Sequence, residues 1–291
     1  MKNFSQKFIF SWLGVLGLGA ILVCLAVFTN AQGGPLEVRF FDVGQGKAVL
    51  IKTPEGHDIL IDGGPDNSVL QKIGEALPFY DRKIDLLILT HPDSDHLNGL
   101  IEVVERYEVA AVIESGISEK SPENEKWELL LKEKNISVNF AKAGQKIKTG
   151  KELSFEIFYP NISLAGKTPS NTNSASIVVR LDYGENSFLF TGDAEEAAEN
   201  YLLGTGANVD VDILDVSHHG SKNSSSLDFL RSVSPEAAII QVGADNRYGH
   251  PHEETLEKLE SSGAKIFRTD LCGDINISAD SERYKIESEC D

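Results

Sequence analysis

The sequence has few basic residues for its acidic content. Its 291 residues include 27 lysines and arginines against 45 aspartates and glutamates, which gives a formal net charge of -18. A long binding track for nucleic acid needs clustered lysine and arginine side chains, so this composition argues against one. It does not exclude phosphate chemistry in a small pocket, where a bound metal ion would supply the positive charge. The sequence also lacks internal repeats and low-complexity tracts, which excludes a solenoid.

Charged residues are absent from one long segment near the N-terminus. Lys2 and Lys7 precede an uncharged run over residues 8–28, and ~20 apolar residues are enough for a helix to span a bilayer. A cleaved signal peptide usually has a shorter apolar core. We therefore expect residues 1–35 to be a single-pass membrane anchor and linker, with the domain of residues 36–291 outside the cytoplasm. Cleavage after Thr29-Asn30-Ala31 would instead make the protein secreted.

Cysteine is scarce, and two of the three cysteines lie near the C-terminus. Residues 273–278 and 283–287 alternate between apolar and polar side chains, which predicts a hairpin centred near Ser281. That hairpin places Cys272 opposite Cys290, so we expect a disulfide bond, with two free thiols as the alternative. A disulfide is typical of an oxidising compartment.

The order of the predicted elements indicates an α/β (α+β) fold in one domain. A β-rich opening followed by βα alternation is typical of two mixed sheets with helices on their outer faces, an αββα sandwich. Strands are predicted at residues 36–43, 48–52, 58–61, 84–89, 176–181, 187–190, 211–216 and 237–242, and helices after residue 64 and at 97–106, 194–203, 227–233 and 253–262.

The densest group of chemically active residues is the segment Thr90-His91-Pro92-Asp93-Ser94-Asp95-His96. It follows an apolar strand and precedes a helical pattern, so four potential ligands come from one tight turn. Imidazole and carboxylate groups suit a hydrolytic divalent metal such as zinc, manganese or iron. A solvated polar loop is the alternative, but this density of ligands after a buried strand favours a metal site.

The segment resembles the H-x-H-x-D-H motif of the metallo-β-lactamase superfamily, with Asp93 at the place of the second histidine. Three more of its motifs follow the superfamily's order along the chain, at residues 59–64, 190–193 and 216–221. Residues 42–46, 217–222, 246–252 and 268–270 narrow the resemblance to the periplasmic hydrolase domain of ComEC-type competence proteins. The resemblance therefore implies a metallo-β-lactamase αββα sandwich without the multi-helix channel of those proteins.

The resemblance also implies one or two divalent metal ions, with zinc as the default and manganese as the alternative. Asp62 would brace the metal loop. One metal ion would be held by His91 and Asp93, the other by Asp95, His96 and either His218 or His219, and Asp193 would bridge the two.

Two departures from the family pattern bear on this site. The superfamily's third-motif histidine is missing, and Asn171 or Asn173 stands near its place, which leaves the first metal ion with fewer strong ligands. An oxygen-richer first site favours manganese. Lys47 stands where the ComEC-type pattern has aspartate, which would alter the surroundings of the ligands or the substrate mouth.

The implied reaction is hydrolysis of a phosphodiester by a metal-activated water. Asp95 is expected to serve catalysis as well as metal binding. His250 would protonate the leaving group or orient a phosphate oxygen. Lys222, Asn246 and His252 would contact the substrate.

The expected substrate is DNA or another phosphate-containing polymer outside the cytoplasm, and no stable protein partner is inferred. Two alternatives stay open. One is another hydrolase on the same fold, acting on a phosphocholine ester or a lactone. The other is a degenerate module that binds without turnover, which Asp93, the missing third-motif histidine and Lys47 keep open.

Overall fold

The computed structural model of the protein describes residues 34–290. The predicted N-terminal anchor lies outside these residues. Among the described residues, no helix is both long enough and apolar enough to cross a membrane.

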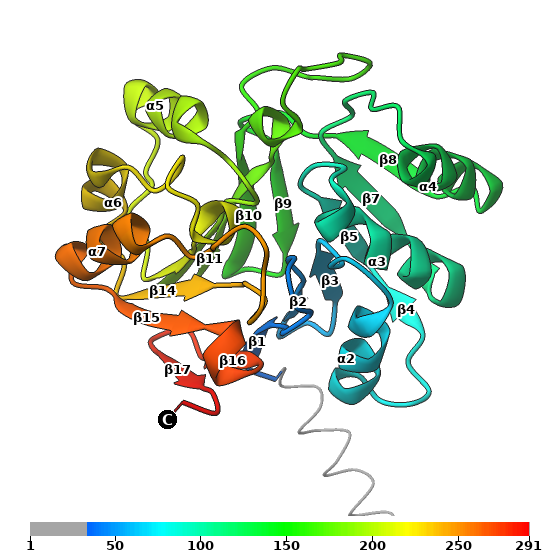
Figure 1. The fold of residues 1–291 in the computed structure, drawn as a ribbon. Helices are drawn as coiled ribbons and strands as arrows, with labels where there is room; N and C mark the ends of the chain where they lie inside the picture. The colour runs from blue at the N-terminus through cyan, green and yellow to red at the C-terminus, as the bar shows by residue number, and fades with distance from the viewer. Residues whose placement is uncertain (1–33, 291) are drawn as a thin grey trace, which may run out of the picture.

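Two large mixed sheets pack face to face and carry helices on their outer sides (Figure 1). The first sheet has eight strands, which are antiparallel from β17 to β3 and parallel from β3 to β8. Its strands, in spatial order, are β17 (Tyr284–Glu287), β16 (Ile275–Ala279), β1 (Leu36–Phe40), β2 (Val49–Lys52), β3 (Asp58–Ile61), β5 (Leu86–Leu89), β7 (Ala111–Glu114) and β8 (Ser137–Phe140).

The second sheet has seven strands, with parallel pairing from β15 to β12 and antiparallel pairing from β12 to β9. Its order is β15 (Lys265–Arg268), β14 (Ala237–Ile240), β13 (Ile213–Asp215), β12 (Asn186–Phe190), β11 (Val178–Tyr183), β10 (Leu153–Tyr159) and β9 (Lys146–Thr149). A small parallel pair joins β4 (Lys83–Ile84) to β6 (Glu108–Val109).

The helices divide between the two outer faces, as Figure 1 shows. The first sheet carries α2 (Ser68–Ala76), α3 (Ser94–Arg106) and α4 (Pro122–Glu133). The second carries α5 (Glu196–Thr205), α6 (Leu227–Val233) and α7 (Glu253–Ser262). Short helices complete the chain at η1 (Thr172–Ala175), η2 (Ser217–Gly220) and α8 (Thr269–Cys272). The αββα sandwich expected from the sequence is confirmed.

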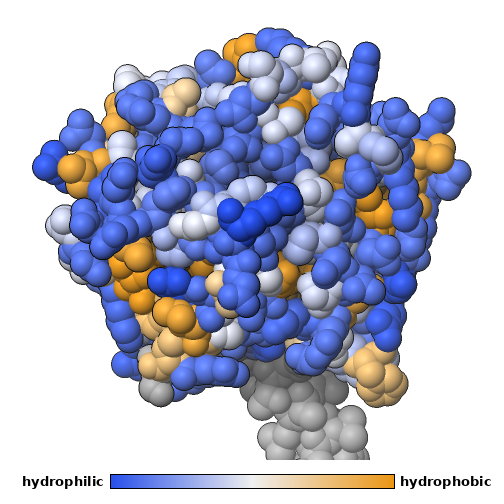
Figure 2. Space-filling view, in the orientation of Figure 1, coloured by the Kyte–Doolittle hydropathy of each residue, from blue (hydrophilic) through white to orange (hydrophobic). Residues whose placement is uncertain are grey.

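Three hydrophobic cores follow from this layering, one between the sheets and one under each set of helices. The central parallel strands β5 and β14 are buried along their whole length, because helices cover the faces that the other sheet does not. Hydrophilic side chains cover most of the face in Figure 2, and hydrophobic ones form small separate patches.

The predicted boundaries of β3, α6 and α7 agree with the structure, whereas the predicted strand at residues 84–89 does not stay whole. Asp85 divides it into β4 and β5. Its backbone N–H donates to the carbonyl of Asp58, and its carboxylate accepts from the Asp58 N–H. Asp85 therefore bonds to the first residue of β3 and belongs to neither β4 nor β5.

The predicted disulfide between Cys272 and Cys290 is confirmed, with 4.9 Å between the Cα atoms. The hairpin of β16 and β17 pairs Asn276 with Glu287, close to the predicted register. Cys272 itself ends α8 rather than extending β16, and the N–H of Glu289 donates to its carbonyl.

Candidate metal centre

The predicted ligands gather where strands of both sheets end. His91 lies two residues after β5, and Asp95 and His96 open α3. Asp193 follows β12 in the other sheet, and η2 carries His218 and His219 beyond the end of β13. The carboxyl ends of parallel strands share one edge of a sheet, which is why residues more than a hundred positions apart meet here.

Two groups of side chains are close enough to hold a metal ion, and His96 belongs to both. The groups are His91, His96 and Asp193, and Asp95, His96 and His219; in each, the ligand atoms lie within 4.8 Å of one another. The Nε2 atom of His96 is 3.3 Å from Oδ1 of Asp193.

Three of these atoms point into the site without a hydrogen-bond partner. They are buried, and they are Nε2 of His91, Nε2 of His96 and Oδ1 of Asp193. Buried polar atoms are nearly always hydrogen-bonded, so three unpartnered atoms that converge are available to bind an ion. Imidazole nitrogens with a carboxylate oxygen are a donor set that divalent zinc or manganese accepts. The residues present therefore fit a divalent metal ion.

The charges in the site depend closely on one another. Burial opposes a charge on His96, but the carboxylates of Asp193 and Asp62 outweigh it and hold the pKa of His96 well above its usual value. Burial likewise opposes a charge on Asp193, and the neighbouring imidazoles His96 and His219 hold its pKa well below the usual range. The pKa of Asp95 is lowered in the same way, against burial, by the hydrogen bond from His219. The carboxylates are thus set up to stay ionised beside a cation.

Asp62 orients His96, as the family resemblance implies. One of its carboxylate oxygens accepts from the backbone N–H of Thr90 at 2.8 Å, and the other accepts from the Thr90 hydroxyl and from Nδ1 of His96, both at 2.7 Å. The carboxylate therefore keeps the proton on Nδ1 and leaves Nε2 free for a metal ion. Asp62 takes a left-handed backbone conformation with φ of 57°, a strained state that the surrounding bonds hold in place.

His219, rather than His218, reaches the ligand groups. Its Nδ1 donates to the carbonyl of Gln241 at 2.8 Å, and its Nε2 lies 3.2 Å from Oδ2 of Asp95. Both histidines have left-handed backbones, with φ of 50° for His218 and 54° for His219. This turn sends the two neighbouring rings in different directions.

Asp93, His218 and Asn173 lie at the margin. Oδ2 of Asp93 is 3.6 Å from Nε2 of His91, and Nε2 of His218 is 3.7 Å from Oδ2 of Asp193, but neither residue belongs to a ligand group. Nδ2 of Asn173 lies 3.4 Å from Nδ1 of His218. Asn173 therefore lies beside the His218 ring.

Six of the seven histidines form one continuous row of rings through the site. His250 lies between His218 and His252, and its ring centroid is 5.5 Å from that of His218 and 4.9 Å from that of His252. Burial and the neighbouring imidazoles lower the pKa of His250 to about 4, so the free protein carries it neutral near pH 7. Its Nδ1 atom is buried and has no hydrogen-bond partner.

The loops that carry the predicted substrate contacts are tightly bonded within themselves. The Asn246 side chain donates to the carbonyls of Gly243 and His250 and accepts from the backbone N–H groups of Tyr248 and His250. These bonds stabilise the turn that carries His250. His252 precedes α7, and its Nδ1 accepts from the N–H of Lys222 at 3.3 Å. The Lys222 side chain is exposed.

A buried ion pair beneath the site was not predicted as such. Nζ of Lys47 donates to Oδ2 of Asp215 at 2.9 Å and to the carbonyl of Val216 at 2.8 Å, with Lys47 only 1% exposed. The side chain of Gln241 donates to the other oxygen of Asp215. Of the two places considered for Lys47, the structure selects the surroundings of the ligands, not the substrate mouth.

Lys47, Asp215 and Gln241 support the two ligand loops from below. The backbone N–H of Lys47 donates to the carbonyl of Asp95, and Gln241 holds His219 through its own carbonyl. Asp215 and Gln241 were missed in the sequence. Their signal is a polar residue at the end of an apolar strand, which is where buried polar groups with partners are found.

The family model of the metallo-beta-lactamase superfamily matches residues 41–244, which include every residue of the two ligand groups but not the His250 turn. This chain belongs to the metallo-beta-lactamase superfamily. Within the superfamily it is 30% identical to ComE operon protein 3 of Bacillus subtilis, over 86% of this chain and 33% of that protein. It is 32% identical to competence protein ComA of Neisseria gonorrhoeae, over 81% of this chain and 31% of the relative.

These relatives confirm the resemblance to ComEC-type competence proteins. The chain spans about a third of the length of the curated relatives it matches. Among solved structures, it resembles the diiron beta-hydroxylase CmlA from Streptomyces venezuelae, with a TM-score of 0.55 and 15% identity over 84% of this chain and 54% of that one. That likeness shows the fold alone. Membership of the superfamily, together with the two ligand groups, indicates a metal-dependent hydrolase.

Proposed function

We propose that this protein is a metal-dependent phosphodiesterase that acts outside the cytoplasm. The observation that supports it best is the convergence of unpartnered buried atoms from His91, His96 and Asp193. A divalent cation bound there supplies Lewis acidity, which lowers the pKa of water and neutralises charge that develops on a phosphoryl oxygen.

The side chains around the site have separable tasks in this proposal. Asp62 fixes His96, and the Gln241 carbonyl fixes His219, so that both Nε2 atoms face the same space. Asp95, at the rim of that space, helps to hold the cation and to orient the attacking water. His250 faces the substrate side and donates a hydrogen bond to the leaving-group oxygen or to a non-bridging phosphate oxygen. A phosphate bound beside it raises its pKa again, because a nearby anion favours the protonated imidazole.

One feature supports DNA, or another phosphate-containing polymer, as the substrate, and two features support a location outside the cytoplasm. A competence protein is among the relatives. The disulfide between Cys272 and Cys290 fits an oxidising compartment, and the uncharged run over residues 8–28 would tether the domain to a membrane.

A binding module without turnover is the second candidate, because Asp93 and His218 lie outside both ligand groups. Turnover of bis(p-nitrophenyl) phosphate by metal-loaded protein, measured beside a lactone and p-nitrophenyl phosphocholine, separates the candidates. The proposal expects metal-dependent release of p-nitrophenol from bis(p-nitrophenyl) phosphate in preference to hydrolysis of the lactone or of p-nitrophenyl phosphocholine, a phosphodiester with a choline group. Metal binding without turnover of any substrate would favour the binding module.

A further inference from the structure

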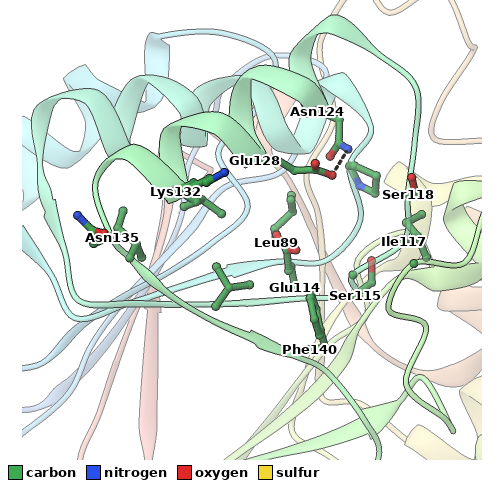
Figure 3. A pocket seen from close by; sticks show the side chains of 16 residues that line it. Leu89, Glu114, Ser115, Ile117, Ser118, Asn124, Glu128, Lys132, Asn135 and Phe140 are labelled. Carbon is green, nitrogen blue, oxygen red and sulfur yellow. Dashed lines mark hydrogen bonds between the residues drawn. The ribbon is translucent and has the colours of Figure 1, made fainter.

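A cavity of about 670 Å³ lies beside the metal loop, between α4 and the carboxyl end of β7 (Figure 3). Pro92, which separates two of the predicted ligands, forms part of its wall. Small-molecule sites typically enclose ~300–1,000 Å³, and ligands of parallel sheets bind beyond the carboxyl ends of the strands. Since β5 and β7 are parallel neighbours, the cavity and the metal loop share this edge of the sheet.

One part of the cavity wall is apolar and contains an aromatic ring. Leu89, Pro92, Ile117 and Val138 contribute aliphatic surface. The ring of Phe140 lies against Gly116, where a Cβ atom would collide with it, yet 43% of Phe140 remains exposed. This wall offers a stacking surface for a flat ligand.

The other part of the wall is rich in hydrogen-bond acceptors. Oε2 of Glu114 accepts from Nε1 of Trp127 at 2.8 Å, and no bond to its Oε1 is found within residues 34–290. Asn124 is only 5% exposed, and its Nδ2 donates to the carboxylate of Glu128 and to the carbonyl of Glu119. Figure 3 shows this pair on the α4 side of the cavity, across from Glu114 and Phe140.

The charge of the cavity decides which ligands it suits. Glu114 and Glu128 oppose a single cation, Lys132, so a phosphate or carboxylate would be repelled. Burial raises the pKa of Glu114, against the hydrogen bond from Trp127. A flat, neutral ligand that donates hydrogen bonds is favoured, because Oε1 of Glu114 can accept such a bond and the two carboxylates do not repel a neutral molecule.

We propose that this cavity binds a nucleobase of the substrate, with the ring against Phe140 and its exocyclic amino group directed to Glu114. This proposal rests on the phosphodiesterase function proposed above. Adenine, cytosine and guanine carry an exocyclic amine, whereas thymine presents a carbonyl oxygen at the corresponding place. The site therefore selects amino-bearing bases over thymine next to the scissile phosphate.

Binding of nucleosides, which lack phosphate, tests the cavity apart from the reaction. The full-length protein is titrated with cytidine, adenosine and thymidine by calorimetry. Tryptophan fluorescence is a second readout in a Trp12→Phe background, where it reports on Trp127 beside the Glu114 carboxylate. A charge-assisted hydrogen bond to the amino group predicts cytidine binding at least about tenfold tighter than thymidine binding. Equal affinity for the two nucleosides, or no binding of either, would overturn the proposal.

Two variants locate the binding. Phe140→Ala should weaken cytidine binding by about fivefold or more, because one base stacked on an aromatic ring contributes that much. Glu114→Gln keeps an acceptor for Trp127 and should reduce the preference for cytidine over thymidine. The matched control is Phe79→Ala, an aromatic residue that is 85% exposed in another loop and should leave the affinity unchanged. Unchanged cytidine binding in Phe140→Ala would contradict the assignment.

The same samples are assayed with bis(p-nitrophenyl) phosphate, which has no nucleobase. Selective cytidine binding without any turnover would refute the phosphodiesterase function and leave the base site standing. Turnover without selective nucleoside binding would refute the base site alone.

Discussion

The buried Lys47–Asp215 pair gives the sharpest prediction about stability. Lys47→Met removes the ammonium group while keeping a side chain of similar length. Because both residues are buried, the change leaves the Asp215 carboxylate without its partner and the Val216 carbonyl without a donor. Breaking a buried ion pair from one side costs about 3–5 kcal/mol, a large share of the ~5–15 kcal/mol that stabilises a typical domain.

The loss should depend on pH in a defined direction. Burial already raises the pKa of Asp215, against the effect of Lys47, and removal of Lys47 raises it further. A group whose pKa is higher in the folded state than in the unfolded state loses stability as pH rises through the folded value. Lys47→Met should therefore be more destabilising at about pH 8 than at about pH 5.

Urea unfolding followed by circular dichroism measures the effect. The matched control is Lys146→Met, which removes an exposed ion pair with Glu156 at the same 2.9 Å distance and should cost less than about 1 kcal/mol. Lys47→Met combined with Asp215→Leu should recover much of the loss, because no buried charge is left unpaired. A loss in Lys47→Met no larger than in the control, or one that is equal at both pH values, would show that the buried ion pair does not stabilise the fold as described.

Three further outcomes are expected. Cys272 and Cys290 should be found oxidised by mass spectrometry of unreduced, natively exported protein, and their replacement by serine should cost ~3 kcal/mol in unfolding free energy; two free thiols in that sample would contradict the pairing. His250→Ala should lower phosphodiester turnover by ~10²–10⁴-fold with the metal content intact, and the loss should shrink for good leaving groups if His250 protonates the leaving oxygen, whereas equal slowing would exclude that step. Asp58→Asn should stabilise the protein by about 1–3 kcal/mol at about pH 8 and not at about pH 4, because burial raises the pKa of Asp58 to about 6 in the folded state. Urea unfolding measures the change, and an equal effect at both pH values would show that the charge of Asp58 is not the cause.

The sequence predicts those parts of the molecule that depend on local pattern. The cluster from His91 to His96 is contiguous, and the periodic apolar residues of α6 and α7 define those helices by themselves. The cysteine pairing follows from a hairpin of neighbouring strands. Each of these features needs only a short stretch of chain to be recognised.

Features that depend on distant contacts are not predictable in this way. Lys47 and Asp215 are 168 positions apart, and only the packing of the two sheets brings them together. The cavity beside α4 is lined by residues of β5, β7, α4 and β8 that lie up to about fifty positions apart, so no short stretch of sequence marks it. The sequence alone allowed the side chain of Asn246 to contact a substrate. In the structure, its amide nitrogen and oxygen both bond to the backbone of its own loop.

The His91–His96 cluster and Asp193 are proposed to form a hydrolytic metal site. Elemental analysis of the purified full-length protein, made beside the double variant Asp95→Ala/His96→Ala, measures whether these residues hold the metal. We expect one to two equivalents of divalent metal in the native protein and none in the variant, because His96 belongs to both ligand groups. A folded variant that retains its metal would contradict the site assignment.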